Sequence, residues 1–185
     1  MLAYTQGRVE ESIAFCRRAV EQDPLNPMAY SFLGRSCISA GRFEEGERAL
    51  RKGLEISPDA IAFHFMIAML YGEQGRYEEG LAEAAREPAD WARLCAQSIL
   101  QFRAGDRAAS DAALEQLIAR GETSGYQIAM AYAARGDNDQ AFAWLDRAFS
   151  GRDSGLAVLK LSRRFEPLHD DPRWPAFLKK LGLEP

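Results

Sequence analysis

The sequence has no surplus of positive charge. Its 185 residues carry 23 Lys and Arg against 27 Asp and Glu, which gives a formal net charge of −4 at pH 7. Proteins that bind nucleic acid or an anionic membrane surface use an excess of Lys and Arg to neutralise phosphates. The composition therefore argues against nucleic acid and against a membrane surface as partners. It is compatible with a folded protein that binds other proteins.

Long apolar runs are also missing. No stretch approaches the ~18 uninterrupted apolar residues of a membrane-spanning helix, although 47% of the residues are hydrophobic. The first eight residues, MLAYTQGR, lack the apolar segment and the cleavage site of a signal peptide. We therefore expect a soluble, cytoplasmic chain.

Cysteine is scarce, and its spacing carries no motif. Cys16, Cys37 and Cys95 are odd in number and form no Cys-x-x-Cys pair, so the pattern indicates neither a disulfide framework nor a zinc ribbon. Small apolar thiols of this kind usually pack in the interior. We expect reduced cysteines that are mostly buried between helices.

The common catalytic motifs are absent as well. The sequence contains no Gly-x-x-x-x-Gly-Lys phosphate loop, Gly-x-Gly-x-x-Gly loop, Gly-x-Ser-x-Gly elbow or His-Glu-x-x-His pair. His64 has no acidic or thiol partner at helical spacing, which favours a packing role over that of a catalytic base. His169, Asp170 and Asp171 are adjacent and converge poorly for a metal, and Asp171 suits a helix cap better. We expect no enzyme, no metal site and no cofactor.

What the sequence does contain is a 34-residue period. The motifs GRVEES, GRFEEG and GRYEEG begin at Gly7, Gly41 and Gly75, and Pro24 and Pro58 are also 34 residues apart. A proline cannot continue a helix, so each proline closes a unit. The Glu pairs recur at every turn, where acidic residues favour a helix N-terminus, and we interpret them as structural instead of as paired catalytic carboxylates.

One complete unit, residues 27–60, predicts two amphipathic helices at about 28–40 and 43–56 with a turn at Gly41. Large and small residues alternate where the two helices would cross, which allows a close approach. This spacing resembles the tetratricopeptide-repeat family. The residues that carry the resemblance are Tyr30, Leu33, Gly34, Cys37, Gly46, Leu50 and Gly53.

The later units are looser. Their turn glycines are Gly105 and Gly136, and Pro88 should end the preceding helix near residue 86. The first helix of the fourth unit, about residues 91–103, has two registers that both stay open. Counting back from Gly105 puts Ser98 and Gln101 at the packing positions, whereas a shift by one residue puts Ile99 and Phe102 there. The last unit is in register at Ala129, Tyr132, Gly136, Ala141, Leu145 and Ala148.

The repeat stops at the turn cluster of residues 150–155. A short apolar helix is expected at about 156–161. A second helix should follow, with Asp171 as its N-cap and Pro172 at its first position, and run to about residue 181. Its apolar face, with Trp174, Phe177, Leu178 and Leu181, suits a cap on the last repeat. We therefore predict an all-α fold, a right-handed superhelix or α-α solenoid at residues 1–151 with about four and a half repeats, the first truncated, and a helical cap at 152–185.

The C-terminal part is also similar to the repeat arrays that follow output domains in bacterial multidomain signalling proteins. The segments that carry this likeness include residues 110–114, 126–129, 144–148 and 165–174. This resemblance implies an accessory role in a bacterial protein and does not name the output.

The family resemblance implies that the first helices line a concave groove for a peptide. Because residues 61–71 are apolar all round apart from His64, Phe65 and Met69 would lie uncovered, and we expect an apolar or amphipathic ligand. Tight curvature or the chain's own tail could cover them instead. A clamp for a chaperone's terminal carboxylate does not fit, since its Lys and Asn are absent. The expected groove residues are Ser31, Arg35, Phe65, Met69, Cys95, Ile99, Tyr126 and Met130.

The function predicted is that of a non-catalytic scaffold that binds another protein or a peptide segment. The alternative is a module for self-association or for regulation of a larger multidomain protein. Met1 falls within a first helix, so Ile13, Cys16 and Val20 would face an incomplete neighbour. We expect either a longer array or a homodimer through this open N-terminal end.

Overall fold

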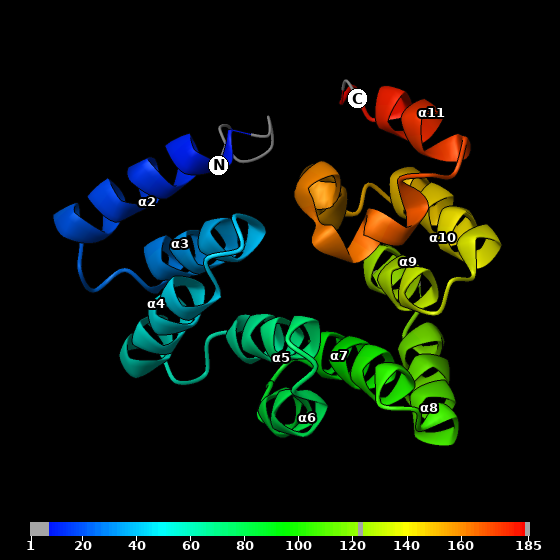
Figure 1. Ribbon diagram of the computed structural model, residues 1–185, viewed down its shortest axis with the longest axis horizontal. Helices are drawn as coiled ribbons and strands as arrows, with labels where there is room; N and C mark the ends of the chain where they lie inside the picture. Colours follow the sequence, from blue (N-terminus) through cyan, green and yellow to red (C-terminus); the bar gives the residue numbers. More distant parts are fainter. Residues whose placement is uncertain (1–7, 122–123, 184–185) are drawn as a thin grey trace. The chain divides into compact units, whose positions relative to one another are not determined.

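The computed structural model describes residues 8–121 and 124–183, and within these ranges every regular element is helical. The all-α fold class is thereby confirmed (Figure 1). The α-helices are α2 (Val9–Gln22), α3 (Pro27–Ser39), α4 (Phe43–Ile56), α5 (Phe63–Glu73), α6 (Tyr77–Ala85), α7 (Asp90–Arg103), α8 (Arg107–Ala119), α9 (Gly125–Ala134), α10 (Asn138–Ser150) and α11 (Arg173–Lys180), and the 3-10 helices are η2 (Ser154–Leu161) and η3 (Arg163–Leu168).

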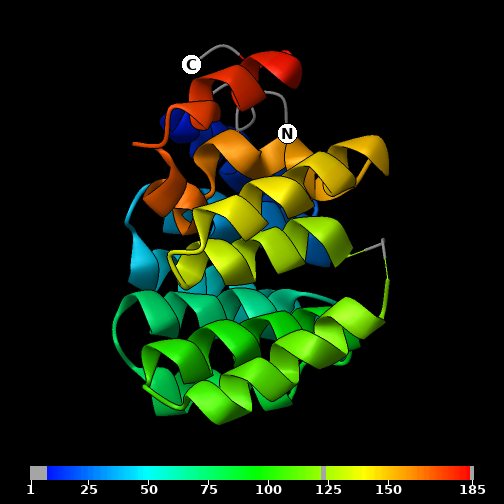
Figure 2. The same ribbon diagram turned by 90° about the vertical axis from the view of Figure 1, so that its right-hand side faces the viewer.

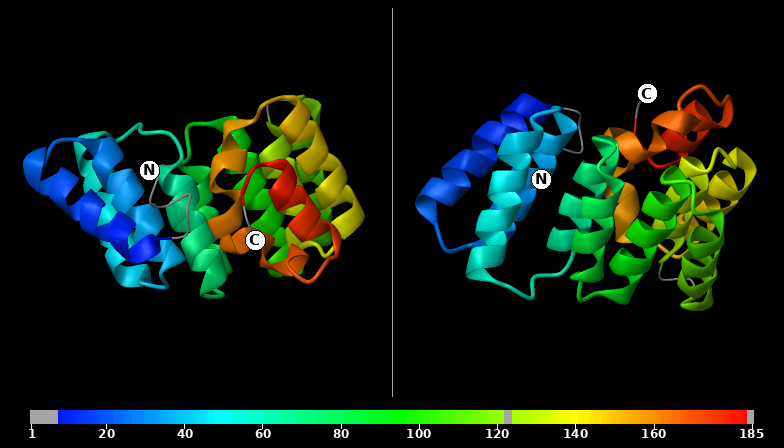
Figure 3. Two further views of the ribbon diagram at one scale, coloured as in Figure 1. Left: turned by 90° about the horizontal axis from the view of Figure 1, so that it is seen from above. Right: turned by 60° about the horizontal axis from the view of Figure 1, so that its bottom comes forward.

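The chain divides into two compact units, Met1–Arg93 and Leu94–Pro185. In the first unit α2, α3 and α4 lie side by side, as Figure 3 shows, and α5 pairs with α6. In the second unit α9 pairs with α10, and the tail follows them (Figure 2). The predicted boundary between repeats and cap, after residue 151, falls inside the second unit and stays a prediction.

Each turn between paired helices depends on a glycine in the left-handed region. Gly41 has a φ of +74° and Gly75 a φ of +75°. The next amide closes the turn, because Arg42 N donates to Cys37 O at 2.8 Å and Arg76 N donates to Tyr71 O at 2.9 Å. Only glycine adopts this backbone without strain, which explains the glycine that recurs with the repeat.

The paired helices cross where both carry a small residue. A Cβ added at Gly34 would lie 3.2 Å from the carbonyl oxygen of Gly46, so the backbones are in close contact there. In the fourth repeat Ser98 and Ser110 occupy the same two places, and Ser110 Oγ donates to Ser98 O at 2.6 Å. The register counted back from Gly105 is therefore the one that the structure has.

The tail packs on both helices of the last pair. Phe165 of η3 contacts the ring of Tyr126 in α9, with 5.3 Å between centroids. Phe177 of α11 contacts the ring of Phe142 in α10 at 6.4 Å. Lys180 Nζ also reaches Asp146 of α10 at 2.7 Å. The expected short helix at 156–161 is a 3-10 helix, and a second one, η3, follows that the sequence did not predict.

The helix crossing generates a stability prediction. A methyl group at Gly34 would lie 2.6 Å from Leu50 Cγ, so Gly34→Ala should overpack the pair. The loss outweighs the higher helix propensity of alanine, and we expect a net destabilisation of about 1 to 2 kcal/mol. Thermal unfolding followed by circular dichroism measures it. The exposed change Glu44→Ala is the control, and an equal melting temperature for G34A and wild type would contradict the crossing.

The cap generates a second prediction. Phe177 is buried against α10, and truncating a buried phenylalanine costs about 3 to 5 kcal/mol. Phe177→Ala should therefore lower the melting temperature clearly or cause aggregation on heating. Lys179→Ala changes an exposed residue of the same helix and should melt like wild type. If F177A melts at the wild-type temperature, the tail does not act as a cap.

Candidate protein-binding surfaces

Most of the predicted groove residues are buried. Phe65 is 7% exposed and Met69 is 1% exposed, so the expectation that these two side chains lie uncovered is wrong. Arg35 alone of the eight is half-exposed. The other buried members of the set are Ser31, Cys95, Ile99, Tyr126 and Met130.

Contacts inside each unit account for part of this burial. In the first unit the ring of Phe65 packs against Trp91, with 6.1 Å between centroids, and its amide donates to the Glu87 carboxylate at 3.1 Å. In the second unit the tail covers Tyr126, because a Cβ added at Gly155 would lie 2.5 Å from its ring. The alternative in which the chain's own tail folds back therefore holds for α9.

Glu87 also explains how α5 begins. Ala62 precedes the helix in the left-handed conformation and offers no side-chain cap. The Glu87 carboxylate accepts hydrogen bonds from the amides of Ala62 at 3.0 Å and Phe65 at 3.1 Å. A buried carboxylate needs such donors, and a helix N-terminus supplies them. This carboxylate is thus held as a cap.

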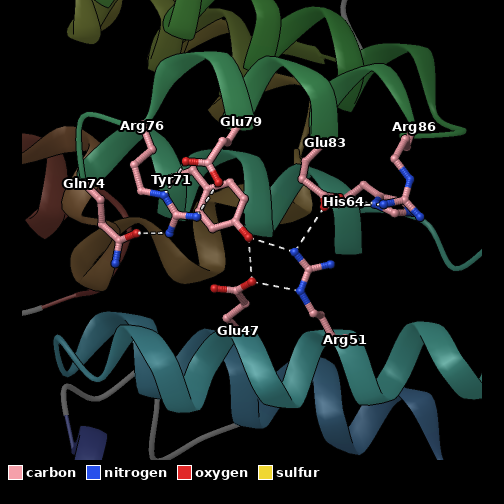
Figure 4. Close-up of polar contacts among 9 residues, drawn as sticks. All are labelled: Glu47, Arg51, His64, Tyr71, Gln74, Arg76, Glu79, Glu83 and Arg86. Atoms are coloured by element: carbon pink, nitrogen blue, oxygen red, sulfur yellow. Dashed lines mark hydrogen bonds and ion pairs between the residues drawn. The ribbon is translucent and has the colours of Figure 1, made fainter.

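His64 has an acidic partner that the sequence did not reveal. Its Nδ1 lies 2.7 Å from an oxygen of Glu83 in α6, and both side chains are buried (Figure 4). Glu83 also accepts from Arg51 at 3.2 Å and from Arg86 at 3.4 Å. The pair is 19 residues apart on two helices, so spacing along one helix could not find it. The signal available in the sequence was Glu83 itself, a charged residue at a packing position, because a buried charge requires a partner.

The same cluster continues through Tyr71, whose hydroxyl donates to Glu47 at 2.6 Å and accepts from Arg51 at 2.7 Å. Burial opposes ionisation of Glu47, but hydrogen bonds from Tyr71 and Arg51 outweigh it and lower its pKa. Burial and the bond to Glu47 raise the pKa of Tyr71. These groups bind one another across α4, α5 and α6, so the cluster serves to join helices.

The residues considered for a metal have other contacts. His169 packs on the ring of Trp174, with 4.8 Å between centroids, and Asp171 accepts from the Arg173 guanidinium at 2.7 Å. That hydrogen bond holds the pKa of Asp171 well below its usual range. Among the residues that the structure describes, no group of three or more His, Cys, Asp or Glu could hold a metal ion. No helix in this part of the chain is long and apolar enough to cross a membrane.

Three of the five large apolar side chains that remain exposed in the described chain lie in the first two repeats. Met28, at the start of α3, is 54% exposed. Phe32, Arg35 and Ser39 follow it at spacings of four, three and four residues, and each is half-exposed. These four residues, which we call the α3 stripe, lie on one face of a helix. The exposed large apolar residues of the described chain are Phe15, Leu25, Met28, Ile61 and Phe149.

The helices are paired, each turn between them contains a left-handed glycine, and small residues lie where they cross. These features define the class of helical repeat proteins, in which each repeat stacks on its neighbour. Tetratricopeptide-repeat family models match residues 3–70 and residues 128–147. The period and the helix pairing agree with those matches. The chain belongs to the tetratricopeptide-repeat family.

Several solved structures have a similar fold. TTC0263, a TPR protein of Thermus thermophilus, is 16% identical with a TM-score of 0.64, and the match covers 88% of this chain and 93% of that chain. MamA is 15% identical with a TM-score of 0.56, covering 81% and 92%. YrrB, described as a TPR protein with an unusual peptide-binding site, is 16% identical with a TM-score of 0.52, covering 86% of each chain. Identities this low show the fold alone. A comparison with curated protein sequences found no match.

The cysteines give a prediction that can be checked on the folded protein. Burial raises the pKa of Cys37 to about 11 and that of Cys95 to about 12, whereas Cys16 is half-exposed. The thiolate is the reactive form, so near neutral pH one thiol per native chain should react with Ellman's reagent. All three should react after denaturation. Rapid reaction of three thiols in the native protein would contradict this burial.

Proposed function

We propose that the chain is a non-catalytic, cytoplasmic scaffold that binds an apolar or amphipathic segment of another protein. Stacked helical repeats present extended surfaces to partners instead of an enclosed reaction site. The peptide-binding site ascribed to YrrB supports a binding role for a relative of this fold. In the clusters described above, the titratable side chains bind one another, which agrees with a role in binding.

The α3 stripe is the observation that carries the proposal. It offers Met28 and Phe32 as apolar anchors and Arg35 as a cation, and Arg35 is one of the groove residues that the family resemblance implies. An amphipathic helix binds such a surface through its own apolar side chains, which are three and four residues apart. Arg35 would contact polar or acidic groups at the edge of that ligand, where a charge is not fully desolvated.

The remaining predicted groove residues have a different part in this proposal. Because they are buried, they would support the first-helix face from beneath instead of contacting the ligand. These residues are Ser31, Phe65, Met69, Cys95, Ile99, Tyr126 and Met130.

Peptide binding tests the proposal. Peptides selected from a displayed random library against the wild-type chain should be apolar or amphipathic, and Met28→Glu should weaken their binding about tenfold or more, since it places a charge at an anchor. Fluorescence anisotropy with labelled peptides gives the dissociation constants.

The matched control is Ile61→Glu, which makes the same kind of change at an apolar residue that is 61% exposed and lies outside the stripe. It should bind as wild type does. Equal binding by M28E and I61E, with both variants folded by circular dichroism, would overturn the stripe as the binding surface.

A further inference from the structure

Helix α3 carries a single charged residue. Arg35 is the only Lys, Arg, His, Asp or Glu of the helix. The corresponding places in the later first helices, six residues before each turn glycine, hold Met69, Ile99 and Met130. These three side chains are apolar and buried, whereas Arg35 is half-exposed. A position that is apolar in the other first helices thus holds a cation that solvent can reach.

The side chain of Arg35 has no ion pair or hydrogen bond with any residue that the structure describes. Neighbouring arginines of the first unit are paired, Arg17 with Glu45 at 2.5 Å and Arg42 with Glu10 at 2.7 Å. Carboxylates are not scarce, since the chain has 27 Asp and Glu against 23 Lys and Arg. Residues 1–7 contain no Asp or Glu. The guanidinium is therefore available to an anion of a partner.

The position of Arg35 on α3 relates it to the apolar anchors of the stripe. It lies three residues after Phe32 and seven after Met28, which is about 4.5 Å and about 10.5 Å further along the helix axis. A helix laid along the stripe would place apolar side chains on Met28 and Phe32 and a residue one turn further on beside Arg35. A guanidinium binds a carboxylate through two parallel hydrogen bonds, so an acidic residue is the best match at that place.

We propose that the partner of the α3 stripe is an acidic amphipathic helix, in which an Asp or Glu one turn from the apolar anchors pairs with Arg35. This inference rests on the proposed function, because it names the chemistry of the segment that the stripe binds. The carboxylate belongs to a side chain, since the Lys and Asn that would clamp a terminal carboxylate are absent. A basic amphipathic helix is disfavoured because its cation would face Arg35.

Peptides selected from a displayed random library against the 185-residue chain test the ligand side. The stripe ligands are those that lose binding to Met28→Glu, and they should carry an Asp or Glu three or four residues from an apolar residue. In the tightest of them, changing that acid to its amide should weaken binding about three- to tenfold, as for an accessible charged hydrogen bond. Amidation of the peptide's C-terminus should leave the dissociation constant unchanged.

Arg35→Glu tests the same contact from the protein side. It opposes the peptide's carboxylate with a like charge, so binding of the tightest fluorescein-labelled peptide should fall about tenfold or more in fluorescence anisotropy. Changing the peptide's acid to Lys should restore binding to R35E and weaken binding to wild type. The matched control, Arg48→Glu, makes the same charge change at an exposed arginine of α4 and should bind as wild type does. Circular dichroism confirms that each variant is folded.

Three results would overturn the acidic partner: stripe ligands without an acid at this spacing, an acid-to-amide change without effect, or an R35E variant that binds like R48E. Loss of binding on C-terminal amidation would also overturn it, because the carboxylate would then be a terminal one. If M28E weakens binding while R35E does not, the stripe stands and this inference alone fails. If M28E leaves binding intact, the stripe fails and this inference fails with it.

Discussion

The close approach of two helices at a pair of small residues is the constraint on which the remaining structure depends. Where Gly34 meets Gly46, the backbones are too near to admit a Cβ without displacing Leu50. The left-handed turn at Gly41 brings the helices to that crossing. Large side chains on either side then interdigitate, and the exposed flank of each pair becomes the packing surface for the next.

This stacking decides where binding surfaces can arise. A repeat that is covered on both flanks keeps few accessible apolar side chains, as α5 shows with Phe65 and Met69 buried. The exposed apolar residues Phe15 and Met28 lie in α2 and α3. The α3 stripe is proposed as a binding surface because its apolar side chains remain accessible.

Polar groups enter this interior only with partners. The buried Glu83 receives His64, Arg51 and Arg86, and Glu87 receives the amides at the start of α5. An unpaired carboxylate in either place would be costly to bury. The clusters hold helices together, and this explains why buried acids and bases occur in a protein whose proposed role is binding.

The sequence by itself determined the all-α class, the family, the turn glycines and the apolar face of the tail, because each of these depends on short-range periodicity and backbone freedom. It left the register of α7 open, missed η3 and the partner of His64, and placed Phe65 and Met69 in solvent. Those features depend on contacts between helices far apart in the chain. Tertiary structure alone decided them, since burial is set by which helix covers a face and not by the pattern along that face.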